Sequence, residues 1–122
     1  MMKVSGGLTF ASVSTGTVHT CGVTTAGAAY CWGENRSWGL NSSGSKLGIG
    51  SDTSPEQCGS YSCSTRPLAV AGGLTFARVS AGGDLTCGIT VDGTVYCWGY
   101  GPALGTGSTQ NSNAPVKVAG QP

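Results

Sequence analysis

Apolar and polar side chains alternate in short runs along this chain, and no stretch of 11 residues carries the apolar period of an amphipathic helix. The alternation is clearest between Leu85 and Gly99. There Cys87, Ile89, Val95 and Cys97 form one apolar face, while Thr, Gly, Tyr and Trp fill the alternate positions. A period of two residues predicts strands. The chain is therefore predicted to be nearly all β, with short strands joined by tight turns.

Composition bounds the classes of function. The 122 residues amount to one domain or less, and 22 of them are Gly. Charged residues make up 9% and the net charge is +1, so no basic surface indicates nucleic acid or anionic lipid. No run approaches the roughly 20 apolar residues of a membrane helix. Partners are therefore expected among proteins or glycans, with no nucleic acid and no membrane span.

The chain repeats itself at an offset of 66 residues. "GGLTFASVSTG" at 6–16 returns as "GGLTFARVSAG" at 72–82, and "HTCGVTTAGAAYCWG" at 19–33 returns as "LTCGITVDGTVYCWG" at 85–99. We predict one repeat over 1–72 and a second over 73–122. The first is longer because it carries insertions at about 34–46 and 51–66.

In the second repeat, "FARVSAGGDLTCGITVDGTVYCWG" is followed by "LGTG" and then by "PVKVAG". This order resembles the regulator of chromosome condensation repeat family, in a cysteine-bearing form, over essentially the whole chain. The resemblance implies a β-propeller of about seven four-stranded blades that serves as a binding platform. Known members exchange guanine nucleotide on a small GTPase, inhibit β-lactamases or sense light, but residues for those activities do not map onto this sequence. The two repeats are thus expected to form two four-stranded antiparallel blades.

Each repeat places two cysteines on a predicted hairpin. If Gly27 and Gly93 are the third residues of three-residue loops, each takes the left-handed conformation of a bulged turn. Directly opposed residues then have Cα atoms about 4.5–5.5 Å apart, which suits a disulfide. The same register sets Gly22 opposite Tyr30, so that a ring is expected to lie over bare backbone. The predicted disulfides are Cys21–Cys31, Cys87–Cys97 and, closing the second insertion, Cys58–Cys63.

Two other uses of the cysteines fit less well. Zinc sites prefer Cys-x2–4-Cys pairs, and redox pairs prefer Cys-x-x-Cys near a helix start; the hairpins have neither, and the only histidine is His19. We expect no metal and no cofactor. Six cysteines indicate an oxidising compartment, although "MMKVSGG" at the start lacks the apolar region of a signal peptide. The expected location is extracellular or cell-surface, the chain being a piece or a matured form of an exported protein.

The remaining candidate residues fall into two groups. Aromatic and polar residues in the insertions have no packing role imposed by the repeat, so they are candidate contacts for a protein or a sugar. Those candidates are Trp38, Tyr61, Arg36 and Glu56. The others are expected to be structural: His19 through a bond to neighbouring backbone, and the aromatic and turn residues through blade packing. That set is His19, Trp32, Trp98, Tyr30, Tyr96, Gly27 and Gly93.

Two blades leave sheet faces and an edge uncovered, so we expect a full propeller to be completed by homo-oligomerisation or by a longer parent chain. "KVSGG" at the start and "KVAGQ" at the end are the same element, which favours head-to-tail copies in a ring of three or four chains or in a filament. We find no nucleophile–base pair and expect no enzyme. The leading hypothesis is a disulfide-stapled propeller module for protein binding or structural assembly. The alternative is a glycan-binding, lectin-like propeller.

Overall fold

The structure, a computed structural model, describes residues 8–17, 19–34, 47–50, 56–58, 61–83, 85–99, 112–119 and 121. All regular elements in these ranges are strands, as the alternation predicts. No helix in the described ranges has the length and apolarity of a membrane span. The strands are β1 (Phe10–Thr15), β2 (His19–Thr24), β3 (Ala29–Glu34), β4 (Glu56–Cys58), β5 (Tyr61–Ala69), β6 (Phe76–Ala81), β7 (Leu85–Thr90), β8 (Val95–Gly99) and β9 (Ser112–Lys117).

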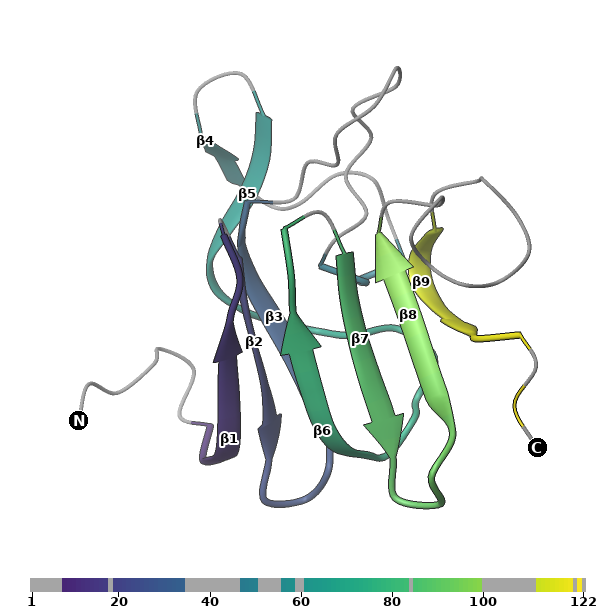
Figure 1. Cartoon of the computed structure of the whole chain (residues 1–122). Coiled ribbons are helices and arrows are strands. Elements are labelled where there is room, and N and C mark those ends of the chain that lie inside the picture. Colours follow the sequence, from purple (N-terminus) through teal and green to yellow (C-terminus); the bar gives the residue numbers. More distant parts are fainter. Residues whose placement is uncertain are drawn as a thin grey trace.

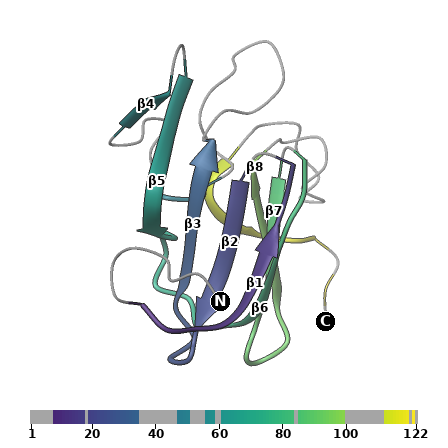
Figure 2. The ribbon, with the colours of Figure 1, turned by 90° about the vertical axis from the view of Figure 1, so that its left-hand side faces the viewer.

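The strands form two antiparallel sheets, one from each repeat (Figure 1). The first has the order β1-β2-β3-β5-β4 and the second the order β6-β7-β8-β9. The four strands of the second sheet are neighbours in chain order, and the first sheet has the same arrangement in β1, β2, β3 and β5, with β4 inserted in the chain before β5, as in two propeller blades. The first sheet has a fifth strand, β4, that the sequence did not predict. The C-terminal part of β5 pairs with β3, and its N-terminal part pairs with the short β4. The second insertion therefore builds a small hairpin at the sheet edge (Figure 2).

The cysteine hairpins have the predicted register. Cys21 lies opposite Cys31 and Cys87 opposite Cys97. The turns close as three-residue loops with a bulge, in which the Gly93 amide donates to the Thr90 carbonyl at 3.0 Å. Gly27 and Gly93 have φ angles of 87° and 91°, which L side chains rarely adopt. Glycine at the third loop position therefore fixes the register in both repeats.

The cover over the strand glycines is not the expected one. Gly22 lies opposite Tyr30, but a Cβ added at Gly22 would meet the Phe10 ring at 2.6 Å and Val13 at 2.9 Å. In the second repeat the Phe76 ring covers Gly88 at the same distance. The phenylalanine reaches this place because β1 and β6 each carry an irregularity of register after their first residue. The ring over the backbone thus comes from the preceding strand.

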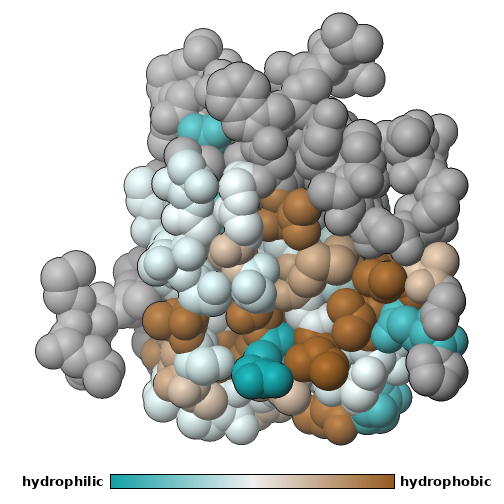
Figure 3. Space-filling view, in the orientation of Figure 1, coloured by the Kyte–Doolittle hydropathy of each residue, from teal (hydrophilic) through white to brown (hydrophobic). Residues whose placement is uncertain are grey.

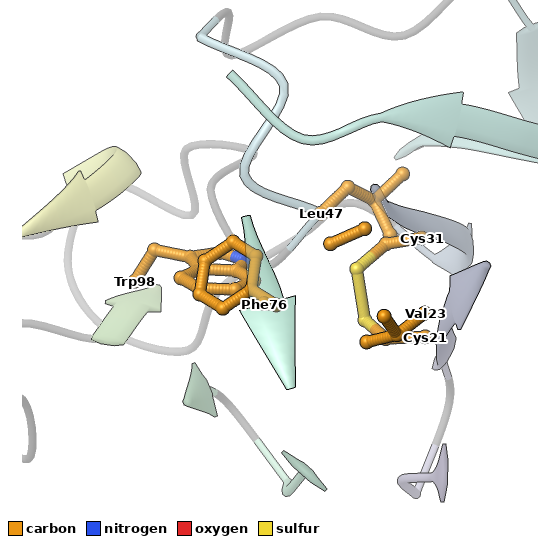
Figure 4. Close-up of a cluster of buried hydrophobic side chains, with 7 residues drawn as sticks. Cys21, Val23, Cys31, Leu47, Phe76 and Trp98 are labelled. Carbon is orange, nitrogen blue, oxygen red and sulfur yellow. A yellow bond between two sulfur atoms is a disulfide. The ribbon is translucent and has the colours of Figure 1, made fainter. Parts of the chain in front are cut away.

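The core lies between the two sheets (Figure 4). The first sheet contributes its cysteine face, and the second contributes the opposite face of its own repeat, with Phe76 and Trp98. Leu47, which is fully buried, joins the cluster from the segment between β3 and β4. The buried cluster comprises Cys21, Val23, Ala29, Cys31, Leu47, Phe76 and Trp98. Each sheet therefore turns a different face toward its neighbour and leaves the other face outward.

Candidate functional site

The insertion residues that the sequence singled out fall largely outside the described part of the chain. Arg36 and Trp38 lie outside the described residues. Glu56 and Tyr61 are described as backbone of β4 and β5, while their side chains lie outside the description. The predicted contact surface in the insertions therefore stays a prediction.

The two hairpin disulfides are present in the structure. Cys21 and Cys31 are joined at an S–S distance of 2.06 Å and have Cα atoms 4.1 Å apart. Cys87 and Cys97 are joined at 2.05 Å with Cα atoms 4.0 Å apart. Cys63 is disulfide-bonded as well, while the side chain of Cys58, its predicted partner, lies outside the description. Each hairpin is therefore closed across its two strands as well as at its turn.

In the part of the chain that the structure describes, no group of three or more His, Cys, Asp or Glu residues could hold a metal ion. Asp92 in the second hairpin turn accepts hydrogen bonds from Thr90 and Thr94, which lower the pKa of its carboxyl. This carboxylate stabilises the turn between β7 and β8.

The contact between the sheets shows how two blades recognise each other. His19 Nε2 hydrogen-bonds Thr86 Oγ1 at 2.7 Å, with the two side chains 3% and 0% exposed. Thr86 Oγ1 also lies 3.9 Å from the sulfur of Cys21. His19 is thus buried, as a structural residue would be, and it bonds a side chain of the other repeat, which the sequence did not indicate.

Backbone groups add to this contact along its inner edge. The Ala81 amide donates to Ser14 Oγ at 3.0 Å, and the Phe76 amide donates to the Gly27 carbonyl at 2.8 Å. Gly16 lies so close that an added Cβ would be 2.3 Å from the Gly82 carbonyl oxygen. Polar bonds at both ends of β6 therefore hold it against the first sheet in one register.

The outward face of the second sheet is apolar and hollowed. A hollow of about 340 Å³ lies over the Cys87–Cys97 hairpin, where Ile89 and Val95 line it and Arg78 and Ser80 border it. Figure 3 looks onto this face and shows hydrophobic surface gathered over β7 and β8. Ile89 and Val95 are half-buried, whereas their counterparts in the first repeat, Val23 and Ala29, are 3% and 5% exposed. The second cysteine face is thus built like the first but lies open.

The outward face of the first sheet carries aromatic side chains from β1 and β3. Phe10 packs against Trp32 with ring centroids 5.5 Å apart and meets Tyr30 edge-on at 6.3 Å. Val13 lies on the same face of β1, beyond the irregularity of register that follows Phe10, and is 55% exposed. Its counterpart Val79 packs against the buried core in the second repeat. The first repeat therefore exposes a valine whose counterpart in the second repeat is packed between the sheets.

The aromatic pairs follow the same division. Trp98 is fully buried, lies 5.9 Å from the Phe76 ring and packs over Gly48, whereas Trp32 is half-buried on the open face. Tyr96 is packed at the margin of the core. The sequence identified these rings as packing residues but missed Val13 and Thr86. Each of these two residues occurs unchanged at the equivalent position of the other repeat, and this repetition was the signal in the sequence. A residue that is exposed in one repeat and buried in the other marks an interface that is open on the exposed side.

Comparison with known proteins agrees with this geometry. A family model described as the regulator of chromosome condensation (RCC1) repeat matches residues 10–37 and 76–102. The chain is 28% identical over 109 residues to the RCC1 domain-containing protein RUG3, mitochondrial, of Arabidopsis thaliana. Among solved structures it resembles Prp20p of Saccharomyces cerevisiae, with a TM-score of 0.72 and 18% identity, and human WBSCR16, with 0.67 and 23%. The structures show the shared fold.

The chain is short beside these proteins. It covers 23% of the Arabidopsis protein and 28% of each of the two solved chains, while 88% and 98% of its own length is matched. The Saccharomyces protein was solved in connection with its binding to Gsp1p and histones, and it was also solved bound to Kap60. The chain thus spans less than a third of the length of each of these proteins.

Proposed function

As a member of the regulator of chromosome condensation (RCC1) repeat family, this chain is, we propose, a non-enzymatic propeller scaffold that binds other proteins. The observation that carries the proposal is the pair of open faces at the two ends of the sheet stack. One exposes Val13 beside aromatic rings, and the other is hollowed over Ile89 and Val95. Exposed apolar surface that is contiguous and shaped is typical of protein interaction sites.

The related propellers support a protein as the partner. Prp20p of yeast was solved in connection with its binding to Gsp1p and histones, and with Kap60 bound. Those partners belong to that protein, and the identity of 18% carries none of them to this chain. What carries over is the type of surface, a rigid platform of blades whose connecting loops meet a folded partner. Here the longest connections are the insertions of the first repeat.

The disulfides support an oxidising location. The described sheets contain two cross-strand disulfides, and a fifth cysteine, Cys63, is also disulfide-bonded. Disulfides of this kind form and persist in exported proteins. We therefore propose that the scaffold acts outside the cell or on its surface. Counting free thiols under denaturing conditions in protein isolated from its natural source tests this placement, and six free thiols would refute it.

Protein binding through the insertions is tested with a paired substitution. The chain is immobilised and exposed to an extracellular protein fraction from its source organism, and retained proteins are identified by mass spectrometry. Trp38→Ala combined with Tyr61→Ala is expected to abolish retention of specific partners, while the control Val91→Ala, in an exposed turn, retains them. Equal retention by all three proteins would contradict the binding site, and binding to a glycan array would favour the lectin.

A further inference from the structure

We propose that the hollow on the second sheet is a docking site for the aromatic face of the first sheet of another copy of this chain. The inference rests on the proposed scaffold function and adds its partner, its polarity and its contact residues. In such an assembly, each chain offers β7 and β8 at one end and β1 to β3 at the other. The occupant is thus already present on the same molecule, at the opposite end of the stack.

The internal contact supplies the template. The second sheet meets the first through Phe76, Val79, Thr86, Tyr96 and Trp98, which are buried or packed against the core. The outward face of the first sheet carries the same residues in the same strand pairing, shifted by 66 positions. Its residues are Phe10, Val13, Thr20, Tyr30 and Trp32. A surface that fits one cysteine hairpin is therefore displayed a second time with nothing described in front of it.

The receiving surface matches the same template. Within the chain, Phe76 lies in one buried cluster with the Cys21–Cys31 hairpin. The equivalent place on the second sheet is the hollow lined by Cys87, Ile89 and Val95. Phe10 of another copy is the residue that the repeat brings to it. Phe10 is thus related to the hollow as Phe76 is related to the Cys21–Cys31 hairpin, with both partners shifted by 66 positions.

Backbone bonds extend the match. The Ala81 amide donates to Ser14 Oγ inside the chain, and the equivalent pair is the Thr15 amide with Ser80 Oγ, at the border of the hollow. One position differs: His19, which bonds Thr86, is replaced by Leu85, which would lie against Thr20. The contact between copies therefore lacks the buried histidine and is more apolar than the internal one. This difference also tells the two contacts apart in experiments.

Docking of this kind is heterologous, because one surface meets a different surface of the partner. It produces a closed ring if the rotation between copies closes, and an open filament if it does not. An isologous dimer, in which like faces meet, would instead stop at two chains. The polarity of the assembly is therefore the property to test.

Sedimentation velocity on the 122-residue chain over a range of micromolar concentrations provides the test. Wild type is expected to form assemblies larger than a dimer. Val13→Asp and Ile89→Asp should each weaken association by about 100-fold or more, because each buries an unpaired carboxylate at one of the two faces. Val91→Asp, at a still more exposed valine in a turn, should assemble as wild type. Circular dichroism and the thiol count verify that each variant is folded and oxidised.

Mixing the two blocked variants identifies the polarity. Val13→Asp keeps the hollow and Ile89→Asp keeps the aromatic face, so an equimolar mixture should form a one-to-one dimer and nothing larger. A wild type that stays monomeric overturns the proposal, and so does a Val13→Asp variant that dimerises alone through two hollows. Two folded monomeric variants that do not pair on mixing also overturn it. A wild type that stays monomeric but still retains extracellular proteins would refute this inference and leave the scaffold function standing.

A second measurement tests the register between copies. In the Leu85→His background, a histidine can bond Thr20 as His19 bonds Thr86 inside the chain. Thr20→Val should therefore weaken association about 2- to 10-fold more in that background than in wild type. An equal effect in both backgrounds would show that positions 85 and 20 do not meet, and it would overturn the proposed fit.

Discussion

The buried bond between His19 and Thr86 is the sharpest test of how the two sheets are joined. His19→Leu places at position 19 the residue that the second repeat carries at Leu85. It removes the hydrogen bond and replaces the imidazole by an apolar side chain of similar size. Thr86→Val removes the hydroxyl with little change of volume. Because both side chains are almost fully buried, each single change deprives a buried polar group of this partner. We expect each to cost about 1–3 kcal/mol of unfolding free energy.

The double variant separates the bond from the rest. His19→Leu with Thr86→Val removes both partners, so it should cost less than the sum of the single changes by about 1 kcal/mol. With an unfolding entropy of about 2.1 cal/mol/K per residue, each kcal/mol corresponds to about 4 °C in Tm for a chain of this length. Thermal unfolding of the four proteins at low concentration, where association is weakest, measures the coupling. Thr20→Val is the matched control on the open face and should change the stability by less than about 0.5 kcal/mol.

Additive single effects would refute this reasoning. Sites without shared partners add to within about 0.3–0.5 kcal/mol, so a coupling inside that range means that the bond does not join the sheets. A large cost for Thr20→Val would be equally damaging, because it would show that threonine at this strand position matters without the histidine.

Three further predictions concern the frame of the blades. Replacing Cys21 and Cys31 by Ala opens a loop of about 11 residues and should cost at least about 2.8 kcal/mol in denaturant unfolding, and a cost under about 1 kcal/mol would contradict the stapling role. Gly16→Ala should destabilise by about 1–3 kcal/mol because its Cβ meets the Gly82 carbonyl, whereas Gly82→Ala, with its nearest atom at 3.3 Å, should cost less in the same assay. Hydrogen bonds lower the pKa of Asp92, so its contribution to stability is present above the ordinary pKa of 3.8 and is lost as pH falls through the lower pKa of the folded state. Asp92→Asn should therefore flatten the decline of Tm on acidification. An unchanged pH profile of Tm would contradict this prediction.

The sequence was sufficient for the hairpins because each of their constraints is local. Gly27 and Gly93 occupy the one loop position that needs a positive φ, so the loop length follows, and with it the register that opposes the cysteines. The cover over Gly22 was wrong because it depends on Phe10, whose position is set by an irregularity in the neighbouring strand. The alternation of residues within one hairpin does not predict where a side chain from the neighbouring strand lies.

The pairing of faces was beyond the sequence for a different reason. Both faces of each blade are apolar, one through cysteine and aliphatic residues and the other through aromatic rings, so the alternation divides them without saying which turns inward. His19 and Thr86 belong to different repeats, and each looks like an ordinary strand residue in its own. Their bond exists only when the cysteine face of the first sheet meets the aromatic face of the second.

The two kinds of face have also diverged to different degrees between the repeats. The aromatic face is the same in both at its central positions, where Phe10, Val13 and Trp32 correspond to Phe76, Val79 and Trp98. The cysteine face differs: Val23 and Ala29 become Ile89 and Val95, and His19 becomes Leu85. If both cysteine faces receive the same aromatic surface, the second contact buries more apolar area and gives up the bond between the histidine and the threonine side chains. Such a contact should depend little on salt, since no charge pair contributes to it, and should weaken on cooling as hydrophobic association does. Dissociation of wild-type assemblies by added salt at constant temperature would show that Arg78, at the border of the hollow, controls the contact in place of the apolar residues beneath it.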